Sequence, residues 1–457
     1  MGREGRRRFL SADLRGLIAL AVPVATVNLG LMAMGVVDTI MVGHLSPADL
    51  AAVALGSLYM MAAAGFGLGT LMALDPVVAQ AVGAGDRPGV ARGIQRGMIL
   101  CLLITLATTL LFLPAARVLE LLGQPADVVP RAGDYVRVSI AGMLPFFAFV
   151  VLRQSLQAMG RMRPIVTVIV AANLLNVVLD WLFVFGHFGP MRGAAGAALA
   201  TVIARWGMAL GLLAVDWSEL RQALMPWRRE ALATAPLLRM FALGAPIGIQ
   251  YQLEFGVFGV IALLMGRLGT VPMAAHQIAI NIASVTFMVP FGVSGAAAVL
   301  VGRAVGAGDP AQARRSARAA LACGLGFMVL SALALGLLPR PLAHIYSNDT
   351  GVLALAATLI PVAAFFQVFD GLQVVSIGIL RGVGDTRTPM IANVLGFWLI
   401  GFPVSLWLGF HTGAGAAGLW WGLVAGLAAV AFFMLVRVRS RMAGALERLA
   451  IEDAAAG

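Results

Sequence analysis

The stretch Ala81-Val-Gly-Ala-Gly-Asp86 occurs a second time as Ala304-Val-Gly-Ala-Gly-Asp309, and this duplication decides the fold. The two copies are 223 positions apart. One such match could be chance in a chain rich in alanine and glycine, but four matches in nearly one register indicate an internal repeat. The other three pairs are Gly43-His-Leu45 with Gly266-Arg-Leu268, Leu156-Gln-Ala-Met-Gly160 with Leu380-Arg-Gly-Val-Gly384, and Gly193-Ala-Ala-Gly196 with Gly415-Ala-Ala-Gly418.

The composition places the repeated chain in a membrane. Of its 457 residues, 60% are hydrophobic and 12% are charged, and the mean hydropathy is +0.93. The charged fraction is about half that of an average soluble domain. So few charges cannot cover a water-exposed surface, which excludes a cytosolic enzyme, a secreted disulfide domain and a disordered chain.

Twelve apolar runs follow one another, six in each copy of the repeat. Each is near or above the ~20 residues that cross a bilayer as a helix. Because six is an even number, both copies start on the same side, and their symmetry axis lies along the membrane normal. The runs are 14–42, 49–80, 94–115, 131–158, 164–186, 193–215, 238–265, 273–304, 318–339, 351–380, 389–410 and 416–436.

These runs predict an all-α integral membrane protein with twelve transmembrane helices. The helices form two six-helix lobes that are related by a pseudo-two-fold axis. We expect an N-terminal lobe at 1–216, a cytoplasmic loop at 217–237, and a C-terminal lobe with a short tail at 238–457. A duplicated two-lobe bundle favours a transporter that works by alternating access over a passive channel.

The basic residues set the orientation. All 32 are arginine; 25 fall on the side of the N-terminus, six fall on the opposite side, and Arg205 lies inside a span. Cytoplasmic loops carry the excess of basic residues, so both termini are expected in the cytoplasm. The arginines are spread over short loops, which argues against nucleic-acid binding.

Acidic residues inside membrane spans are costly, and their default interpretation is functional. From the helical rise, Asp38 and Asp180 lie about 8–9 Å from the outer ends of their spans, and Thr201 about 12 Å. Asn176 is one turn from Asp180. Such oxygens suit Na⁺, and a pair of carboxylates suits a proton. The acids inside the spans are Asp38, Asp180, Glu254 and Asp370.

The second copy of the repeat carries different polar groups. Glu254 and Asp370 lie about 16–18 Å from the ends of their spans, near the middle of the bilayer. Their repeat counterparts, Leu31 and either Phe146 or Phe147, are apolar. The two halves are therefore expected to share a fold while holding different sites.

Other features of the sequence say less about function. Arg205 could pair with a buried acid, and a structural role is favoured for Asp75, which precedes Pro76. The chain has no Walker A loop, HExxH or GxSxG, and no pair of histidines with metal spacing. We therefore expect no enzyme activity and no cofactor. Side chains that could line an adaptable apolar substrate cavity are Phe287, Met288, Phe291 and Phe366.

Several motifs resemble the MATE (multidrug and toxic compound extrusion) transporters, in particular the NorM type, over essentially the whole chain. The longest joins Phe366-Gln-Val-Phe-Asp-Gly-Leu-Gln-Val-Val375 to Leu380-Arg-Gly-Val-Gly-Asp-Thr-Arg-Thr-Pro-Met390. The others are Val37-Asp-Thr-Ile-Met-Val-Gly-His-Leu45, Ala274-Ala-His-Gln-Ile-Ala279, Phe287-Met-Val-Pro290 and Val301-Gly302.

The resemblance implies a central cavity and the export of cationic amphiphilic compounds in exchange for Na⁺ or H⁺. It implies a multi-pass protein of a bacterial-type inner membrane that works as a monomer among membrane lipids. It also assigns cation-binding or coupling roles to polar residues in both lobes, with Na⁺ as a possible ligand in the N-lobe. The N-lobe residues are Asp38, Asn176, Asp180 and Thr201, and the C-lobe acids are Glu254 and Asp370.

Two positions depart from the pattern of the family. Some NorM proteins have tyrosine where Phe366 stands, and Asp75 stands where serine or threonine is expected. Two alternatives stay open: a lipid-linked oligosaccharide flippase of the same superfamily, and a membrane-embedded transferase. The flippase should have a cationic cavity, whereas the charges inside these spans are mainly acidic. The transferase should have a metal motif such as DDxxD, which the sequence lacks.

Overall fold

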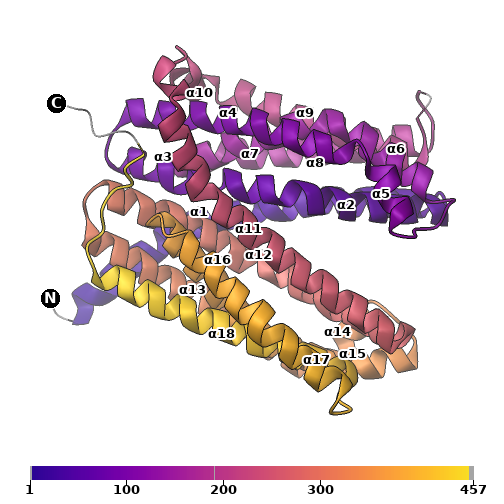
Figure 1. Ribbon diagram of the computed structural model, residues 1–457. Coiled ribbons are helices and arrows are strands. Elements are labelled where there is room, and N and C mark those ends of the chain that lie inside the picture. The colour runs from indigo at the N-terminus through magenta and orange to yellow at the C-terminus, as the bar shows by residue number, and fades with distance from the viewer. Residues whose placement is uncertain (1–2, 190, 452–457) are drawn as a thin grey trace. The chain divides into compact units, whose positions relative to one another are not determined.

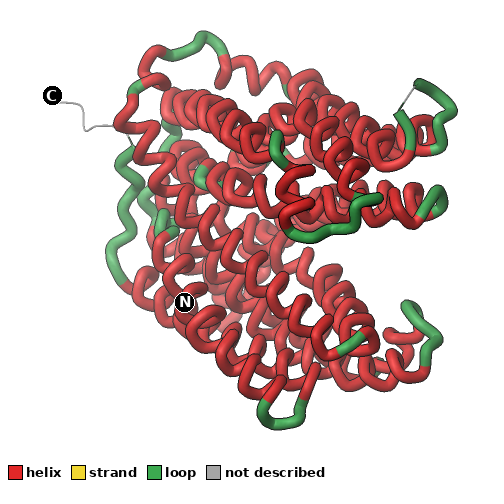
Figure 2. Tube along the Cα trace, turned by 45° about the vertical axis from the view of Figure 1, so that its right-hand side comes forward, coloured by secondary structure: helices red, strands yellow, loops and turns green. Residues whose placement is uncertain are grey.

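The computed structural model describes residues 3–189 and 191–451, and these are almost entirely helical. Within them no strand occurs, and short loops join the helices (Figure 2). The helices labelled in Figure 1 and their connecting turns are α1 (Arg3–Gly43), α2 (Pro47–Leu71), α3 (Leu74–Gly83), α4 (Arg87–Phe112), α5 (Ala115–Leu121), α6 (Val129–Ser139), the 3₁₀ turn η1 (Ile140–Gly142), α7 (Met143–Ala158), α8 (Met162–Val184), α9 (Gly193–Val215), α10 (Trp217–Leu224), the 3₁₀ turn η2 (Arg229–Leu232), α11 (Thr234–Leu268), α12 (Thr270–Gly306), α13 (Pro310–Leu337), α14 (Pro339–His344), α15 (Thr350–Gly382), α16 (Arg387–Asn393), the π-helical η3 (Val394–Gly401), α17 (Phe402–Phe410) and α18 (Gly415–Ala443).

Twelve segments of the described chain are long and apolar enough to cross a membrane, which confirms the predicted number of spans. Several are longer than the apolar runs, because polar residues extend the helices at their ends. The second run, expected at 49–80, is helical from Pro47 to Gly83 except for a short turn. The short helices α5, α10 and α14 lie between spans.

The repeated hexapeptides adopt the same backbone conformation. Gly85 and Gly308 both have φ of 68°, a left-handed value that glycine adopts without strain. The N–H of the following residue, Asp86 or Asp309, donates to the carbonyl five residues earlier at 2.9 Å. Each of these carboxylates then accepts the N–H three residues later at 2.8 Å and caps the next helix, α4 or α13.

The packing of helices also repeats. In the first half α8 packs on α9, α4 on α7, and α5 on α6. The corresponding pairs in the second half are α17 with α18, α13 with α15, and α14 with α15. The duplication seen in the sequence is therefore a duplication of structure.

Prolines account for the places where the halves differ. A proline ring clashes with the carbonyl four residues earlier, so Pro76 separates α2 from α3, whereas the corresponding α12 is continuous. Two further prolines inside spans follow a change of helix type: Pro145 follows the 3₁₀ turn η1, and Pro403 follows the π-helical η3. Four more lie within continuous helices: Pro23, Pro246, Pro290 and Pro361.

The contacts divide the chain into two compact units. The N-unit comprises Thr26–Gly248 with the chain end from Ala450, and the C-unit comprises Ile249–Leu449 with the chain start up to Ala25. The boundaries fall inside α1 and α11. The lobes at 1–216 and 238–457 divide the sequence by its repeat, and that division stays a prediction.

An ion pair ties the loop after the fourth span of each repeat. In the N-unit, Arg161 donates two hydrogen bonds of 2.5 and 2.6 Å to the carboxylate of Asp216. This bonding raises the pKa of the Arg161 guanidinium above its ordinary value. At the repeat-equivalent position of the C-unit stands Asp385, which accepts from Arg437 at 2.6 Å. The two ion pairs are matched in place and reversed in sign.

Candidate functional site

Asp38 is the centre of a buried polar cluster in the N-unit. It lies in the last turns of α1, and 3% of its surface is exposed. Its Oδ2 accepts a hydrogen bond of 2.6 Å from Thr201 Oγ1 on α9. Its Oδ1 accepts one of 3.2 Å from Asn176 Nδ2 on α8. Three helices thus contribute polar groups to one carboxylate.

Asp180 completes this cluster. It lies one turn beyond Asn176 on α8, it is fully buried, and its carboxyl group neighbours that of Asp38. Two ionised carboxylates can only accept hydrogen bonds, and no described residue donates one to either oxygen of Asp180. The carbonyl oxygen of Asn176 also lacks a donor. Three buried oxygens therefore keep free lone pairs.

The structure brings together the four residues that the sequence predicted for this half: Asp38, Asn176, Asp180 and Thr201. Their depths along separate helices had placed them at one level, and the hydrogen bonds confirm that Asp38 contacts two of the others. Carboxylate, amide and hydroxyl oxygens are ligands for a hard cation. Two adjacent carboxyls can equally share a proton. The binding of either ion stays a prediction.

Arg205 borders this cluster, which the sequence suggested only in general terms. Its guanidinium lies 4.7 Å from the centre of the Phe146 ring, and its Nη1 contacts the sulfur of Met143 at 3.7 Å. It also attracts Asp38 and interacts electrostatically with the buried Tyr135. Arg205 is four residues after Thr201 on α9, so helical spacing could have placed it on the face of the site.

A second acidic pair lies in the C-unit. Asp370 on α15 is buried, and Glu254 on α11 is half-buried. Gln373, one turn after Asp370, donates from Nε2 to Glu254 Oε1 at 3.2 Å. The charged group that acts on Asp370 is Glu254, which has the same sign. Sequence reasoning missed Gln373, although its spacing of three residues from Asp370 indicates a shared helix face.

Aromatic rings pack beside Asp370. Phe366, one turn before it, is 1% exposed and packs edge-on against Phe258 at 6.0 Å and Trp420 at 5.7 Å between ring centres. Trp420 also contacts the ring of His276. The other predicted cavity residues, Phe287, Met288 and Phe291, are half-buried on α12. A substrate-binding role for these side chains stays a prediction.

Asp75 interacts with a buried arginine. It is 1% exposed on α3, and its charge attracts Arg153 on α7, which is 6% exposed. Arg153 also donates to Asn28 on α1 at 3.1 Å. A buried acid paired with a buried arginine between packed helices fits the structural role that the sequence favoured for Asp75.

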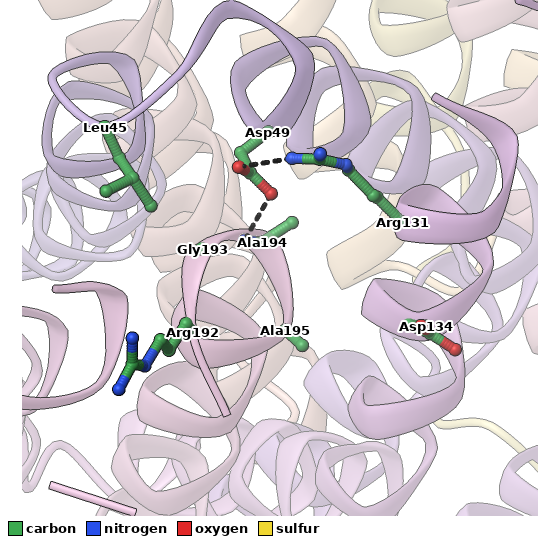
Figure 3. A pocket seen from close by; sticks show the side chains of 8 residues that line it. All are labelled: Leu45, Asp49, Arg131, Asp134, Arg192, Gly193, Ala194 and Ala195. Atoms are coloured by element: carbon green, nitrogen blue, oxygen red, sulfur yellow. Dashed lines mark hydrogen bonds and ion pairs between the residues drawn. The ribbon is translucent and has the colours of Figure 1, made fainter. Parts of the chain in front are cut away.

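A further polar cluster holds the ends of three helices beside a cavity of about 260 Å³ (Figure 3). Asp49 on α2 accepts a hydrogen bond of 2.7 Å from Arg131 on α6 and one of 3.3 Å from the backbone N–H of Ala194 on α9. It also accepts from Ser46 at 2.6 Å. Because its oxygens already accept hydrogen bonds, we interpret Asp49 as a structural residue that holds the start of α9 in place.

Comparison with known proteins places this architecture in a family. The family model described as MatE matches the chain twice, at residues 23–182 and 246–407. The two matches start 223 residues apart, which is the spacing of the repeated hexapeptide. The chain belongs to the MatE family. Each match contains one acidic pair, with Asp38 and Asp180 in the first and Glu254 and Asp370 in the second.

Curated MatE relatives match nearly the full chain. Multidrug resistance protein PmpM of Pseudomonas aeruginosa is 38% identical, and the match covers 98% of this chain and 96% of that protein. Multidrug resistance protein NorM of Burkholderia vietnamiensis is 37% identical, with 92% of each chain covered. The chain is therefore a multi-pass membrane transporter and not an enzyme, and these relatives are bacterial.

Solved MATE structures share the fold. The eukaryotic MATE transporter AtDTX14 superposes with a TM-score of 0.86 at 23% identity, covering 94% of this chain and 96% of that one. The Vibrio cholerae MATE transporter VcmN in its bent form superposes with 0.84 at 22% identity, covering 95% and 98%. These likenesses confirm the predicted fold class.

Proposed function

We propose that this MatE transporter exports cationic amphiphilic compounds by antiport, in exchange for Na⁺ or H⁺. The names of PmpM and NorM as multidrug resistance proteins support the substrate class. The observation that carries the coupling is the buried cluster around Asp38 on α1, whose carboxylate accepts from Asn176 Nδ2 on α8 and Thr201 Oγ1 on α9. Charged groups placed so expensively inside membrane spans mark ion pathways.

The coupling ion acts through the charge of this cluster. With Asp38 and Asp180 both ionised, the site repels itself and lacks donors for Asp180. A Na⁺ ion bound between the oxygens, or a proton on one carboxyl, relieves that repulsion. Because a bound ion favours the conformation that holds it best, it shifts the transport equilibrium and lowers the affinity for the exported cation.

The C-unit pair supplies the second set of acids. Gln373 donates to Glu254, which favours the ionised form of this carboxylate. Glu254 and Asp370, beside the ring of Phe366, offer negative charge and an aromatic surface. Such a combination attracts cationic amphiphilic compounds.

The arrangement in the membrane is also part of the proposal. We place the protein in the bacterial inner membrane as a monomer, with both termini in the cytoplasm. The 25 arginines on the side of the N-terminus, against six on the other side, support this orientation. Both ion pairs, Arg161 with Asp216 and Asp385 with Arg437, then lie at the cytoplasmic face.

Ethidium efflux from reconstituted vesicles tests the function and identifies the ion. A Na⁺ pulse at constant pH and a pH jump without Na⁺ are applied separately. We expect one of these gradients to drive efflux in the wild type, and Asp38→Asn to abolish the response. Asp134→Asn is the matched control, because Asp134 is exposed and pairs with Arg137 within one helix. Absence of dye movement under either gradient would refute drug antiport.

A further inference from the structure

Arg205 occupies the middle of a membrane span. It lies 12 residues after the start of α9 at Gly193 and 10 residues before its end at Val215. These separations correspond to about 18 and 15 Å along the helix. A positive charge at such a depth is costly and is kept for a function by default. Its repeat counterpart, Leu427, is a fully buried apolar residue of α18.

Arg205 contacts a weak hydrogen-bond acceptor and an aromatic ring, so its charge can act on the nearby acids. Its hydrogen-bond acceptor is the thioether of Met143, a weak acceptor at 3.7 Å. Its guanidinium stacks on Phe146 at 4.7 Å, which holds the group in place. On the same helix, one turn before it, Thr201 donates to Asp38 at 2.6 Å. The arginine is thus fixed on the helix face that builds the cation site.

Two titratable groups from other helices interact with Arg205: Asp38 on α1 and the phenol of Tyr135 on α6, whose hydroxyl is 3.2 Å from Ser57 Oγ. Asp180 on α8 interacts with both Asp38 and Tyr135 and so belongs to the same cluster. When both carboxylates are ionised they carry two negative charges, and Arg205 adds one positive charge. In that state the cluster carries a net charge of minus one.

We propose that Arg205 is an internal counter-charge that limits the N-unit site to one monovalent coupling cation, an inference that rests on the proposed function. With Arg205 present, one Na⁺ or one H⁺ makes the cluster neutral. Without it, the cluster would carry two negative charges, hold its first cation more tightly and accept a second. Arg205 is thereby a residue that sets ion affinity and stoichiometry.

Charge-removing variants test this role in reconstituted protein. Arg205→Met is expected to lower the ion concentration for half-maximal ethidium efflux about tenfold, the usual effect of one neighbouring charge. It is also expected to raise the number of cations bound per purified protein at this site from one to two. Arg205→Lys keeps the charge and should remain near the wild type. Arg153→Met is the matched control, since Arg153 is a buried arginine of the same unit that interacts with Asp75.

A rescue experiment separates a charge role from a structural one. Asp180→Asn leaves a cluster with no net charge and should lose the ion response. Combining Asp180→Asn with Arg205→Met restores a net charge of minus one, so the ion response should return. This double variant requires only that the protein tolerate methionine at position 205. The combination of Asp180→Asn with Arg205→Lys is the control; it keeps the positive charge and should stay unresponsive.

Three results would count against the proposal. Half-saturating ion concentrations of Arg205→Met equal to those of wild type would overturn it, as would a double variant that stays as unresponsive as Asp180→Asn. A double variant with lysine at position 205 that regains the ion response would contradict the charge arithmetic. Failure of the wild type to respond to either ion would instead refute the proposed function, so the two failures are distinguishable.

Discussion

Each unit carries one acidic pair on the same repeated fold, but the two pairs stand at different positions and have different surroundings. In the N-unit, Asp38 of the pair with Asp180 is attracted by Arg205, which stacks on Phe146. In the C-unit, Asp370 stands at the repeat position of Phe146 and faces a second acid, Glu254. The aromatic ring on which an arginine stacks in one unit is thus replaced by an acid in the other, and the repeat counterpart of Arg205 is the apolar Leu427. The two copies of the repeat therefore share their helix packing but differ in the charged side chains inside their spans.

We propose that this difference reflects separate roles for the two sites. The N-unit cluster has a neighbouring positive charge, Arg205, and polar groups at hydrogen-bonding distance, which suits a small coupling ion. In the C-unit the charge that acts on Asp370 is a second acid, and aromatic rings lie nearby, which suits a larger organic cation.

Removing the hydroxyl of Thr201 tests whether the N-unit site controls the ion dependence of transport. Thr201→Val keeps the shape of the side chain and removes the donor to Asp38. A hydrogen bond to a charged group contributes about 1.5–3 kcal/mol, so the ion concentration for half-maximal efflux should change at least about tenfold. The Na⁺ concentration should rise, because Na⁺ loses an oxygen ligand, whereas the H⁺ concentration should fall, because the ionised carboxylate loses its donor. Thr201→Ser, which keeps the hydroxyl, is the control. An altered half-saturating dye concentration with unchanged ion dependence would contradict these separate roles.

Removing the amide of Gln373 tests whether the C-unit site controls the affinity for the exported dye. Gln373→Met removes the donor to Glu254, and the half-saturating ethidium concentration should rise about tenfold by the same reasoning. The ion dependence should stay near that of the wild type. Transport kinetics at saturating ion provide the measurement, with Gln373→Asn as a shorter amide control. A shift in ion dependence with an unchanged half-saturating ethidium concentration would contradict the separate roles of the two sites.

Backbone glycines test the equivalence of the two folds. Gly85 and Gly308 have the same left-handed φ and open space around the site of a new Cβ. Gly85→Ala and Gly308→Ala should each destabilise the protein by about 1–2 kcal/mol, because only the backbone strain of an L-residue is added. Thermal unfolding in detergent checks this, and a clear inequality between the two variants would show that the repeats differ locally.

The reversed ion pairs should have the smallest effect. Asp216→Asn and Asp385→Asn should each cost about 1 kcal/mol of stability or less, since the partner arginines are 42% and 40% exposed. The raised pKa of Arg161 means that the stabilisation by this pair is present below the ordinary arginine pKa and is lost only as pH rises through the higher folded value. Stability of the wild type minus that of Asp216→Asn should thus be constant from about pH 7 to about pH 10. A loss within that window would contradict this assignment.

Much of this architecture could be predicted from sequence because its signals are local and periodic. The number of spans follows from apolar runs, and the repeat follows from glycine turns whose φ values only glycine adopts readily. The meeting of Asp38, Asn176 and Thr201 followed from the fixed rise of a helix. That estimate works because the spans start and end near the same two planes.

The remaining features depend on packing between helices. Nothing in the spacing of residues shows that Arg205 stacks on Phe146, because the rotation of α9 against α7 decides it. The contact of Gln373 with Glu254 likewise depends on how α15 faces α11. Neither the break between α2 and α3 near Pro76 nor the π-helical η3 before Pro403 was predicted, since both depend on local hydrogen bonding within the span.

The central claim is that the N-unit pair binds the coupling ion and the C-unit pair binds the exported cation. The most direct test measures both equilibria on purified Asp38→Asn and Asp370→Asn proteins, with ion binding by titration calorimetry and ethidium binding by fluorescence anisotropy. We predict that Asp38→Asn loses ion binding and keeps ethidium binding, whereas Asp370→Asn does the reverse. Loss of both ligands in both variants, or the opposite assignment, would contradict the account.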